Sequence, residues 1–571
     1  MLHDAFDTLI ERLPFSRARA LQAVADRTAA ATSHGQASAA QRSVRIPLRV
    51  QLAVAGALAV LAAVVYARSL TNALVGDDWV LVEHSAGGLG AALSWTGNYH
   101  YNPVVQVMLL VIYAFFGVNP IAYHAAALLF FWASSVGVLY VGWRLSGRYS
   151  VGVIAAILFI CQGRQYEAVI WGAVALFQTV GLVLFLGGFL GYLLYLDARA
   201  ERRRRWAYGV FLAGVILGPF AYEPEVVLTL VCMLYRLFVV EAQRGWSMSE
   251  LRSRAPAWVR DFAAPVILLG GYGLFKEWLG RTANQAPGLS DSLSGWLHTA
   301  ERGIAVAFTP GISLYAIAPP PLAALASHSI IQKGVLVLAA AALILLVVRG
   351  TPLYQFLLAS TLLVVLTMTV ALGTIASRHI LLLCVPAVIL LALLLSDMTR
   401  WLGDWLSNRD YLGVRLTRMR PALRWAPAGL MVVAWVVLGA HYAFIQQQTW
   451  TATAAEEDRL VAQIDAFVHA DPGADTLYLV NLPDYNASPT GDIDDPAFLF
   501  RNGAPSLIRL TMPRRFALVE AAYTGLYDPW RVGISATEQQ LDSWSQQGHI
   551  LVLHYDATRG DIQRWQSPVS G

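Results

Sequence analysis

Two adjacent carboxylates, Asp77 and Asp78, follow the first long apolar stretch of the sequence. Charges at the edge of a membrane are unfavourable unless they are solvated, paired or used. A carboxylate in this position could accept the proton of an attacking hydroxyl or bind a divalent cation. The structural alternative is an ordinary acidic loop in which Trp79 anchors the chain at the membrane interface. This acidic pair is the first candidate for chemistry.

Other chemically useful side chains stand at the ends of later apolar stretches. Glu167 begins one stretch, where the positive end of a helix dipole would also favour a carboxylate for purely structural reasons. Glu223 lies in a tight turn, and Lys276 lies near the end of another apolar stretch. Arg378 and His379 open a further one. Arginine binds phosphate with paired N–H donors, although an interfacial arginine also extends toward lipid headgroups without any other role.

The elements that position these residues are mostly apolar. Hydrophobic residues make up 57% of the 571 residues and charged residues 14%, with a mean hydropathy of +0.52. A soluble domain carries about 25% charged residues, and apolar runs of about 18 or more are typical of transmembrane helices. The three cysteines lie within apolar runs without metal-ligand spacing, and no charge pattern indicates nucleic acid. The sequence therefore predicts an integral membrane protein.

The arginines predict the orientation, because cytoplasmic connections carry an excess of positive charge. If residues 103–117 and 301–318 dip into the membrane or lie flat, every basic connection lands on the cytoplasmic side. Both runs are short, Pro-flanked and near or below the ~20 residues that a span needs. The pattern then predicts about eleven spans. It places the N-terminus in the cytoplasm and the C-terminal region outside an inner, or plasma, membrane.

We expect three parts in the chain. These are a cytoplasmic leader over residues 1–46, a transmembrane module over 47–446 and an extracytoplasmic domain over 447–571. The fold class is mainly α, a polytopic membrane helical bundle followed by a small C-terminal α/β domain.

Within the C-terminal domain, local patterns predict particular elements. Residues 454–469 are predicted to form a helix, and residues 476–482 and 549–555 to form strands. Residues 498–512 are predicted to add further strand, with a turn at Asn502-Gly503.

The order of polar motifs along the first half of the chain resembles the GT-C superfamily, the polytopic glycosyltransferases that use polyprenyl-phosphate-linked sugars. The likeness is greatest to protein O-mannosyltransferases and to aminoarabinose-transferase-like bacterial members. Those proteins carry an acidic pair in the first outer loop, then a Pro-led short helix, a Gly-Asn-Pro-like turn, a His-bearing helix and a His-x-x-Glu-Ala-Val-like segment. The first four matching segments here are Asp77-Asp78, Tyr99-His100-Tyr101-Asn102-Pro103, Gly117-Val118-Asn119-Pro120 and His124. The last reads Gln165-Tyr166-Glu167-Ala168-Val169 and departs from the family pattern, because no histidine precedes its glutamate. The resemblance covers roughly residues 60–240, and the second half only through Arg378.

The resemblance implies a GT-C-like fold and a role for each candidate. One of Asp77 and Asp78, with Asp77 favoured, would deprotonate the acceptor hydroxyl, and Glu167 would help to hold the acceptor or a metal. Arg378, with His379, would neutralise the leaving phosphate. The further substrate-binding candidates are Glu223, Tyr101 and Lys276.

The implied reaction is inverting transfer of a hexose or pentose from a polyprenyl-phosphate-linked donor to a glycan, lipid or protein acceptor. Asp77, Asp78 and Glu167 could also hold a divalent cation, Mg²⁺ or Mn²⁺, although the sequence requires no cofactor. Membrane lipids are the other expected partners. Two alternatives stay open: a lipid or polysaccharide flippase, which would place charges deep within spans, and a non-catalytic scaffold with the same fold.

Overall fold

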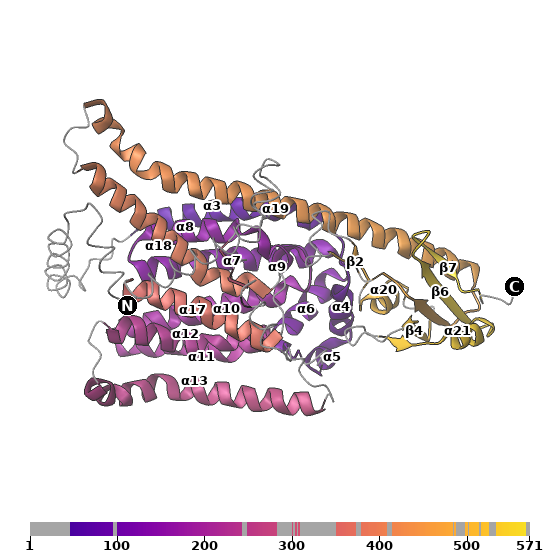
Figure 1. Ribbon diagram of the computed structural model, residues 1–571. Coiled ribbons are helices and arrows are strands. Elements are labelled where there is room, and N and C mark those ends of the chain that lie inside the picture. The colour runs from indigo at the N-terminus through magenta and orange to yellow at the C-terminus, as the bar shows by residue number, and fades with distance from the viewer. Residues whose placement is uncertain are drawn as a thin grey trace, which may run out of the picture. The chain divides into compact units, whose positions relative to one another are not determined.

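The computed structural model describes residues 46–94, 100–242, 248–282, 300, 303–304, 307–308, 350–372, 379–407, 414–483, 485–486, 497–500, 502–512, 516–524 and 533–566. The chain divides into two compact units, residues 1–52 and residues 53–571. Figure 1 labels the helices and strands.

The part of the chain before the C-terminal domain is helical throughout the described residues. Its first helices are α3 (Leu48–Tyr66), α4 (Asp77–Ala86), α5 (Gly88–Ser94), α6 (Pro103–Phe116), α7 (Pro120–Ser146), α8 (Tyr149–Ile160), α9 (Glu167–Ile170), α10 (Ala175–Asp197), α11 (Glu201–Ala221), α12 (Leu228–Tyr235) and α13 (Met248–Thr282). Short helical turns connect some of them, among them η1 (Ala67–Thr71), η3 (Gly163–Gln165), η4 (Glu223–Val227) and η5 (Arg236–Glu241). The later helices are α17 (Pro352–Leu372), α18 (Ile380–Ser407) and α19 (Val414–Ala470).

Six helices among the described residues are long and apolar enough to cross a membrane. They cover Leu48–Thr71, Pro120–Ser146, Ala175–Asp197, Pro352–Thr369, Ile380–Trp405 and Arg424–Ala470. The multi-pass prediction is confirmed in this form. The total of eleven spans and the orientation stay predictions, because residues 309–349 lie outside the described part of the chain.

Helix α6 fits the prediction that residues 103–117 do not span. It has 14 residues, which rise about 21 Å, whereas the hydrocarbon core of a bilayer is about 30 Å thick. Pro103 starts the helix, and Gly117, at a φ of 58°, ends it. Helices α4 and α5 pack against α6.

Small residues let the helices of the bundle approach closely. A Cβ atom built on Gly214 of α11 would lie 2.7 Å from the Cα of Gly188 on α10. Gly142 of α7 and Gly152 of α8 meet in the same way, with a Cβ on Gly142 only 3.1 Å from the Gly152 Cα. Such close backbone contacts are a main source of packing energy between membrane helices.

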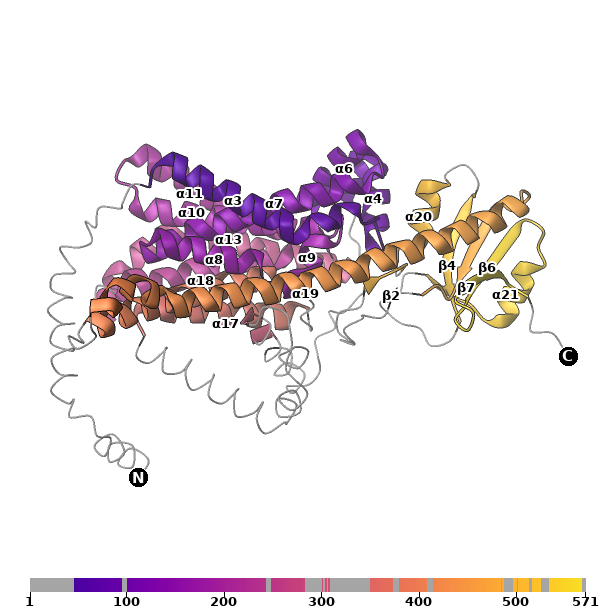
Figure 2. The ribbon, with the colours of Figure 1, turned by 90° about the horizontal axis from the view of Figure 1, so that it is seen from above.

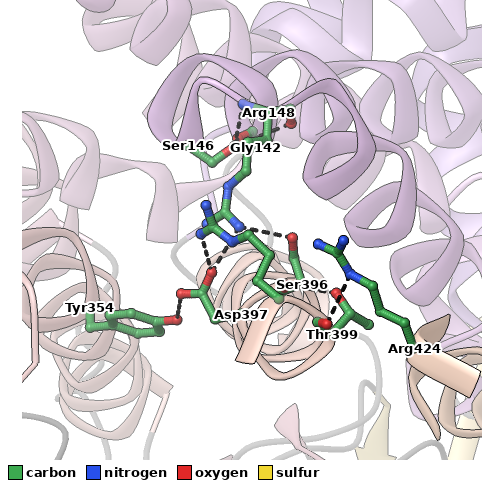
Figure 3. Close-up of polar contacts among 9 residues, drawn as sticks. Gly142, Ser146, Arg148, Tyr354, Ser396, Asp397, Thr399 and Arg424 are labelled. Atoms are coloured by element: carbon green, nitrogen blue, oxygen red, sulfur yellow. Dashed lines mark hydrogen bonds and ion pairs between the residues drawn. The ribbon is translucent and has the colours of Figure 1, made fainter. Parts of the chain in front are cut away.

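An ionic cluster, here called the Arg148–Asp397 cluster, joins α8, α17 and α18 (Figure 3). Arg148 Nη1 donates to Asp397 Oδ1 at 2.8 Å and to Ser396 Oγ at 2.8 Å. The Tyr354 hydroxyl donates to Asp397 Oδ2 at 2.5 Å. Arg400 forms a further ion pair with Asp397. Every element of this cluster is thereby tied to one carboxylate.

Helix α19 connects the bundle to the C-terminal domain. Its 57 residues correspond to about 85 Å of helix, and it packs along α18 near one end and beside the sheet near the other (Figure 2). The predicted helix over residues 454–469 is confirmed, but it is the continuation of the last apolar span and not a separate element.

The C-terminal domain contains a mixed sheet in the order β5-β4-β1-β6-β7. Its strands are β1 (Thr476–Val480), β4 (Leu518–Tyr523), β5 (Ile534–Ser535), β6 (Ile550–Asp556) and β7 (Asp561–Arg564), with α21 (Glu538–Ser545) before β6. β1 pairs in parallel with β4 and β6, and β7 is the antiparallel edge. The predicted strands over 476–482 and 549–555 are thus confirmed as β1 and β6.

The strand predicted over residues 498–512 is wrong after Phe498, whereas the predicted turn at Asn502-Gly503 is confirmed. Ala497–Phe498 (β3) pairs briefly with Tyr485–Asn486 (β2), and the chain then forms α20 (Ala504–Thr511). Pro505 at the start of the segment suits the first turn of a helix. Ala504, Leu507 and Ile508 are buried at helical spacing, so the apolar residues of this segment form one helix face.

Candidate active site

The acidic pair begins α4 immediately after a glycine turn. Gly76 has a φ of 54° and a ψ of −123°, a conformation that favours glycine. The turn directs the chain so that Asp77 and Asp78 fall in the first turn of α4, where the helix dipole stabilises negative charge. The acidic loop is defined here as residues 74–79.

Asp78 is fully buried and is held by backbone N–H groups. Its Oδ2 accepts from the Val75 N–H at 3.2 Å, and its Oδ1 accepts from the Val174 N–H at 3.0 Å. A Cβ atom on Gly172 would lie 2.7 Å from Asp78 Oδ2, so the chain before α10 can approach this closely only as glycine. The Trp171 indole N–H also donates to the Val75 carbonyl, at 3.3 Å. Asp78 therefore fastens the acidic loop to the segment before α10.

Burial raises the pKa of Asp78 to about 7, and the neighbouring Asp77 adds to the rise. The N–H groups of Val174, Val75 and Ala173 act in the opposite direction because they stabilise the carboxylate. Burial has the larger effect.

Asp77 differs from its neighbour in exposure and in partner. Its side chain is half-buried. Its Oδ1 accepts a hydrogen bond at 3.2 Å from the Nδ2 of Asn502, in the turn before α20. Of the two carboxylates, Asp77 is the one that faces the C-terminal domain.

A third carboxylate near the acidic loop was not among the predicted site residues. Glu457 of α19 is buried, and its Oε1 accepts from the Trp79 indole N–H at 2.7 Å. Its Oε2 has no hydrogen-bond partner among the described residues. The signal was present in the sequence: Glu457 precedes Leu460 and Ile464 at helical spacing, on the buried face of α19.

Glu167 is buried at the start of α9, on the segment that leads to Trp171 and Val174. The contacts of this segment with the acidic loop are made by Trp171 and Val174. Among the described residues, no group of three or more His, Cys, Asp or Glu side chains is arranged to hold a metal ion. The described partners of Asp78 are backbone N–H groups, and the metal-binding role of Asp77, Asp78 and Glu167 stays a prediction.

Three of the predicted substrate-binding residues do come together, in what we call the Glu223 cluster. Glu223 Oε1 lies 3.0 Å from His100 Nδ1 and 3.4 Å from Lys276 Nζ. Tyr101 packs on Phe275, one residue before Lys276, with ring centroids 5.3 Å apart. Burial alone would raise the pKa of Glu223, but the charges of His100 and Lys276 hold it at about 2.

A cavity of about 450 Å³ adjoins this cluster, between α11, η4, α12 and α13. Phe220 and Phe275, which both contact Tyr101, line it together with Tyr272 and several aliphatic side chains. Glu225 also lines it, buried and without a hydrogen-bond partner among the described residues. The cavity thus combines mostly apolar walls with a rim that carries both a carboxylate and an ammonium group.

Helix α6 connects the Glu223 cluster to the acidic loop. His100 and Tyr101 lie directly before α6, and Gln106 on α6 accepts a hydrogen bond from Ser85 on α4 at 3.3 Å. Of the two remaining candidates, His379 lies buried just before α18, whereas Arg378 is outside the described residues.

No protein-family model matches the sequence, and no curated protein matches it. Among solved structures, the chain is similar to ArnT from Cupriavidus metallidurans in the apo state, at 12% identity and a TM-score of 0.47 over 90% of this chain and 93% of that one. The structure of the same protein bound to undecaprenyl phosphate is similar at 12% identity and a TM-score of 0.45, again over 90% of this chain and 93% of that one. The archaeal oligosaccharyltransferase AglB from Archaeoglobus fulgidus, in complex with an inhibitory peptide and a dolichol-phosphate, gives 11% and 0.47 over 91% of this chain and 74% of that one. The similarity to these two proteins extends over about 90% of the chain.

Proposed function

We propose that this protein is a GT-C-type membrane glycosyltransferase. It transfers a sugar from a polyprenyl-phosphate donor to an acceptor hydroxyl and inverts the anomeric centre. The observation that carries the proposal is the unequal setting of the acidic pair: Asp78 is sealed and bonded to backbone N–H groups, while Asp77 is partly exposed at the first turn of α4. A general base has to be accessible to its substrate and held in a fixed position. Asp77 is accessible, and the bonds of Asp78 hold the loop that carries it in place.

The proposed reaction uses few groups of the protein. The acceptor oxygen attacks the anomeric carbon, and its proton passes to Asp77. The bond between that carbon and the phosphate oxygen breaks, and its electron pair leaves with the lipid phosphate. Arg378 and His379 are proposed to stabilise the departing negative charge, and Glu167 to help orient the acceptor.

The Glu223 cluster and the cavity beside it support a lipid-linked donor. The cavity offers apolar and aromatic walls to part of a prenyl chain. Lys276 brings positive charge to its rim, where Glu223 orients the ammonium group. In this arrangement the leader is cytoplasmic, and the donor headgroup lies on the outer face of the inner, or plasma, membrane under the C-terminal domain.

The test is sugar transfer by the purified full-length protein in lipid nanodiscs, with a panel of short-chain polyprenyl-phospho-sugars. Asp77→Asn is compared with the wild type and with Asp397→Asn, which removes a carboxylate from the Arg148–Asp397 cluster. Thermal unfolding of each variant checks that the fold is retained. We expect turnover by the wild type and Asp397→Asn, and its loss in Asp77→Asn.

Two results would contradict this function. Full turnover by Asp77→Asn would remove the proposed base. Absence of turnover with every donor, together with no binding of polyprenyl phosphate, would favour the scaffold or flippase alternative.

A further inference from the structure

The C-terminal domain contacts the acidic loop directly. The Asn502 side chain donates to Asp77, although 425 residues separate the two in sequence. Gly503 lies against Gly76: a Cβ atom built on Gly503 would be only 1.9 Å from the Gly76 carbonyl oxygen. Because no side chain fits between these two turns, their backbones pack together and bring the Asn502 amide within reach of the carboxylate.

A second contact fixes the angle at which α20 meets α4. Arg509 Nε donates to Glu83 Oε1 at 2.5 Å, and Arg509 Nη2 donates to Glu83 Oε2 at 2.9 Å. A bidentate guanidinium–carboxylate pair is directional as well as strong. The interface is therefore held at both ends, by Asn502 on Asp77 and by Arg509 on Glu83.

We propose that Asn502 is a positioning residue for Asp77, so that docking of the C-terminal domain completes the active site. The inference rests on the proposed function, in which Asp77 is the general base. A hydrogen bond to one carboxylate oxygen fixes the plane of the carboxylate. The orientation of this plane determines from which direction an acceptor hydroxyl can approach the base. The amide contacts the base and not the lipid donor, so its removal slows turnover and leaves donor binding unchanged.

The experiment measures kcat and the donor KM for full-length Asn502→Ala, Asn502→Asp and Arg509→Gln in nanodiscs, beside the wild type and Asp77→Asn. Loss of one hydrogen bond to a charged group predicts about a tenfold lower kcat for Asn502→Ala, with a donor KM within about twofold of the wild type. Asn502→Asp has the same shape but sets a second negative charge beside Asp77, and we expect its kcat to fall further. Arg509→Gln weakens the same interface away from Asp77, and we expect a smaller loss in kcat than for Asn502→Ala.

The double variant Asp77→Asn/Asn502→Ala separates positioning from a structural role. If Asn502 acts through Asp77, the double variant turns over no more slowly than Asp77→Asn alone. A wild-type kcat in Asn502→Ala would overturn the inference, as would equal losses in kcat for Asn502→Ala and Arg509→Gln. Unchanged turnover in Asp77→Asn would instead overturn the proposed function, and the positioning role with it.

Discussion

The two ends of α7 lie beside two charged regions that are built in different ways. Its 27 residues separate these ends by about 40 Å. Its first turns share a core with Leu74 and Trp79 of the acidic loop. Its last residue, Ser146, bonds to Arg148 of the Arg148–Asp397 cluster. In that cluster one carboxylate is paired with two arginines and a tyrosine hydroxyl.

The acidic loop shows the opposite arrangement. Asp78 and Glu457 are buried, and the partners described for them are N–H groups without net charge. Arginines neutralise the charge of the Asp397 carboxylate, and this ion pairing is sufficient to explain its position. A buried carboxyl group bonded only to neutral N–H groups either carries an unneutralised negative charge or binds a proton. Such unfavourable burial is typical of functional sites. The comparison therefore supports the proposal that chemistry takes place at the acidic loop, whereas the cluster around Asp397 contributes to stability.

The largest expected effect sharpens this comparison at Asp77. Loss of a general base lowers kcat by about 10²- to 10⁴-fold, and Asp77→Asn should do so with little change in the thermal unfolding midpoint, because the side chain is half-buried and keeps its shape. Steady-state kinetics and thermal unfolding of one preparation measure both quantities. A large drop in stability together with the lost turnover would make Asp77 a structural residue.

The pH dependence of stability tests the unusual setting of Asp78. Its pKa is about 7 in the folded state, against ~3.9 for an unfolded aspartate. The folded state thus binds the proton more tightly, so this contribution to stability is fully present below about pH 4 and is lost as the pH rises to about 7. We expect the contribution of Asp78 to the free energy of unfolding to fall by on the order of 4 kcal/mol across this window. The difference in thermal unfolding between the wild type and Asp78→Asn at each pH measures this contribution, and a contribution that rises with pH would contradict the comparison.

Asp78→Asn is the next largest perturbation. The amide cannot accept two hydrogen bonds on two different atoms, so either the Val75 or the Val174 N–H loses its acceptor inside the protein. A buried donor without a partner costs about 1–3 kcal/mol. Chemical denaturation should show this loss, and the pH dependence assigned to Asp78 should disappear in the variant. Asp77→Asn is the matched control, in which neither change is expected.

Asp397→Asn is expected to have the smallest effect. Its side chain is 36% exposed, so solvent screening limits the energy of its ion pairs to about 1 kcal/mol or less. The variant should unfold slightly earlier while kcat and the donor KM stay at the wild-type values. A loss of turnover with the fold intact would break the distinction between the two regions.

Local patterns predicted those parts of the fold that depend on neighbouring residues. β1 and β6 are apolar segments bounded by turns, and both were located from the sequence. The strand prediction for residues 498–512 was wrong because the β-forming residues of this segment form one face of α20, which packs against α4 and β4. The continuity of α19 was also missed, since the polar residues after its apolar span indicated a new domain and not an extended helix.

The candidate site was predicted in pieces. Glu223, Lys276 and Tyr101 were selected separately, and the structure places them in one cluster because η4, α13 and the segment before α6 converge. Glu457 stands in a run of acidic residues that also fits a solvated face. Its spacing to Leu460 and Ile464 places it on the apolar face of α19, but only the tertiary packing of α19 brings that face against the acidic loop.

The sequence by itself determined that this is a multi-pass membrane protein and that an acidic pair follows the first span. Both facts depend on the composition and order of contiguous residues. Only the tertiary structure decided that Asp78 is the buried carboxylate and that Asp77 is the one contacted by the C-terminal domain. The reason is physical: Val174, which bonds Asp78, lies 96 residues away, and Asn502, which bonds Asp77, lies 425 residues away.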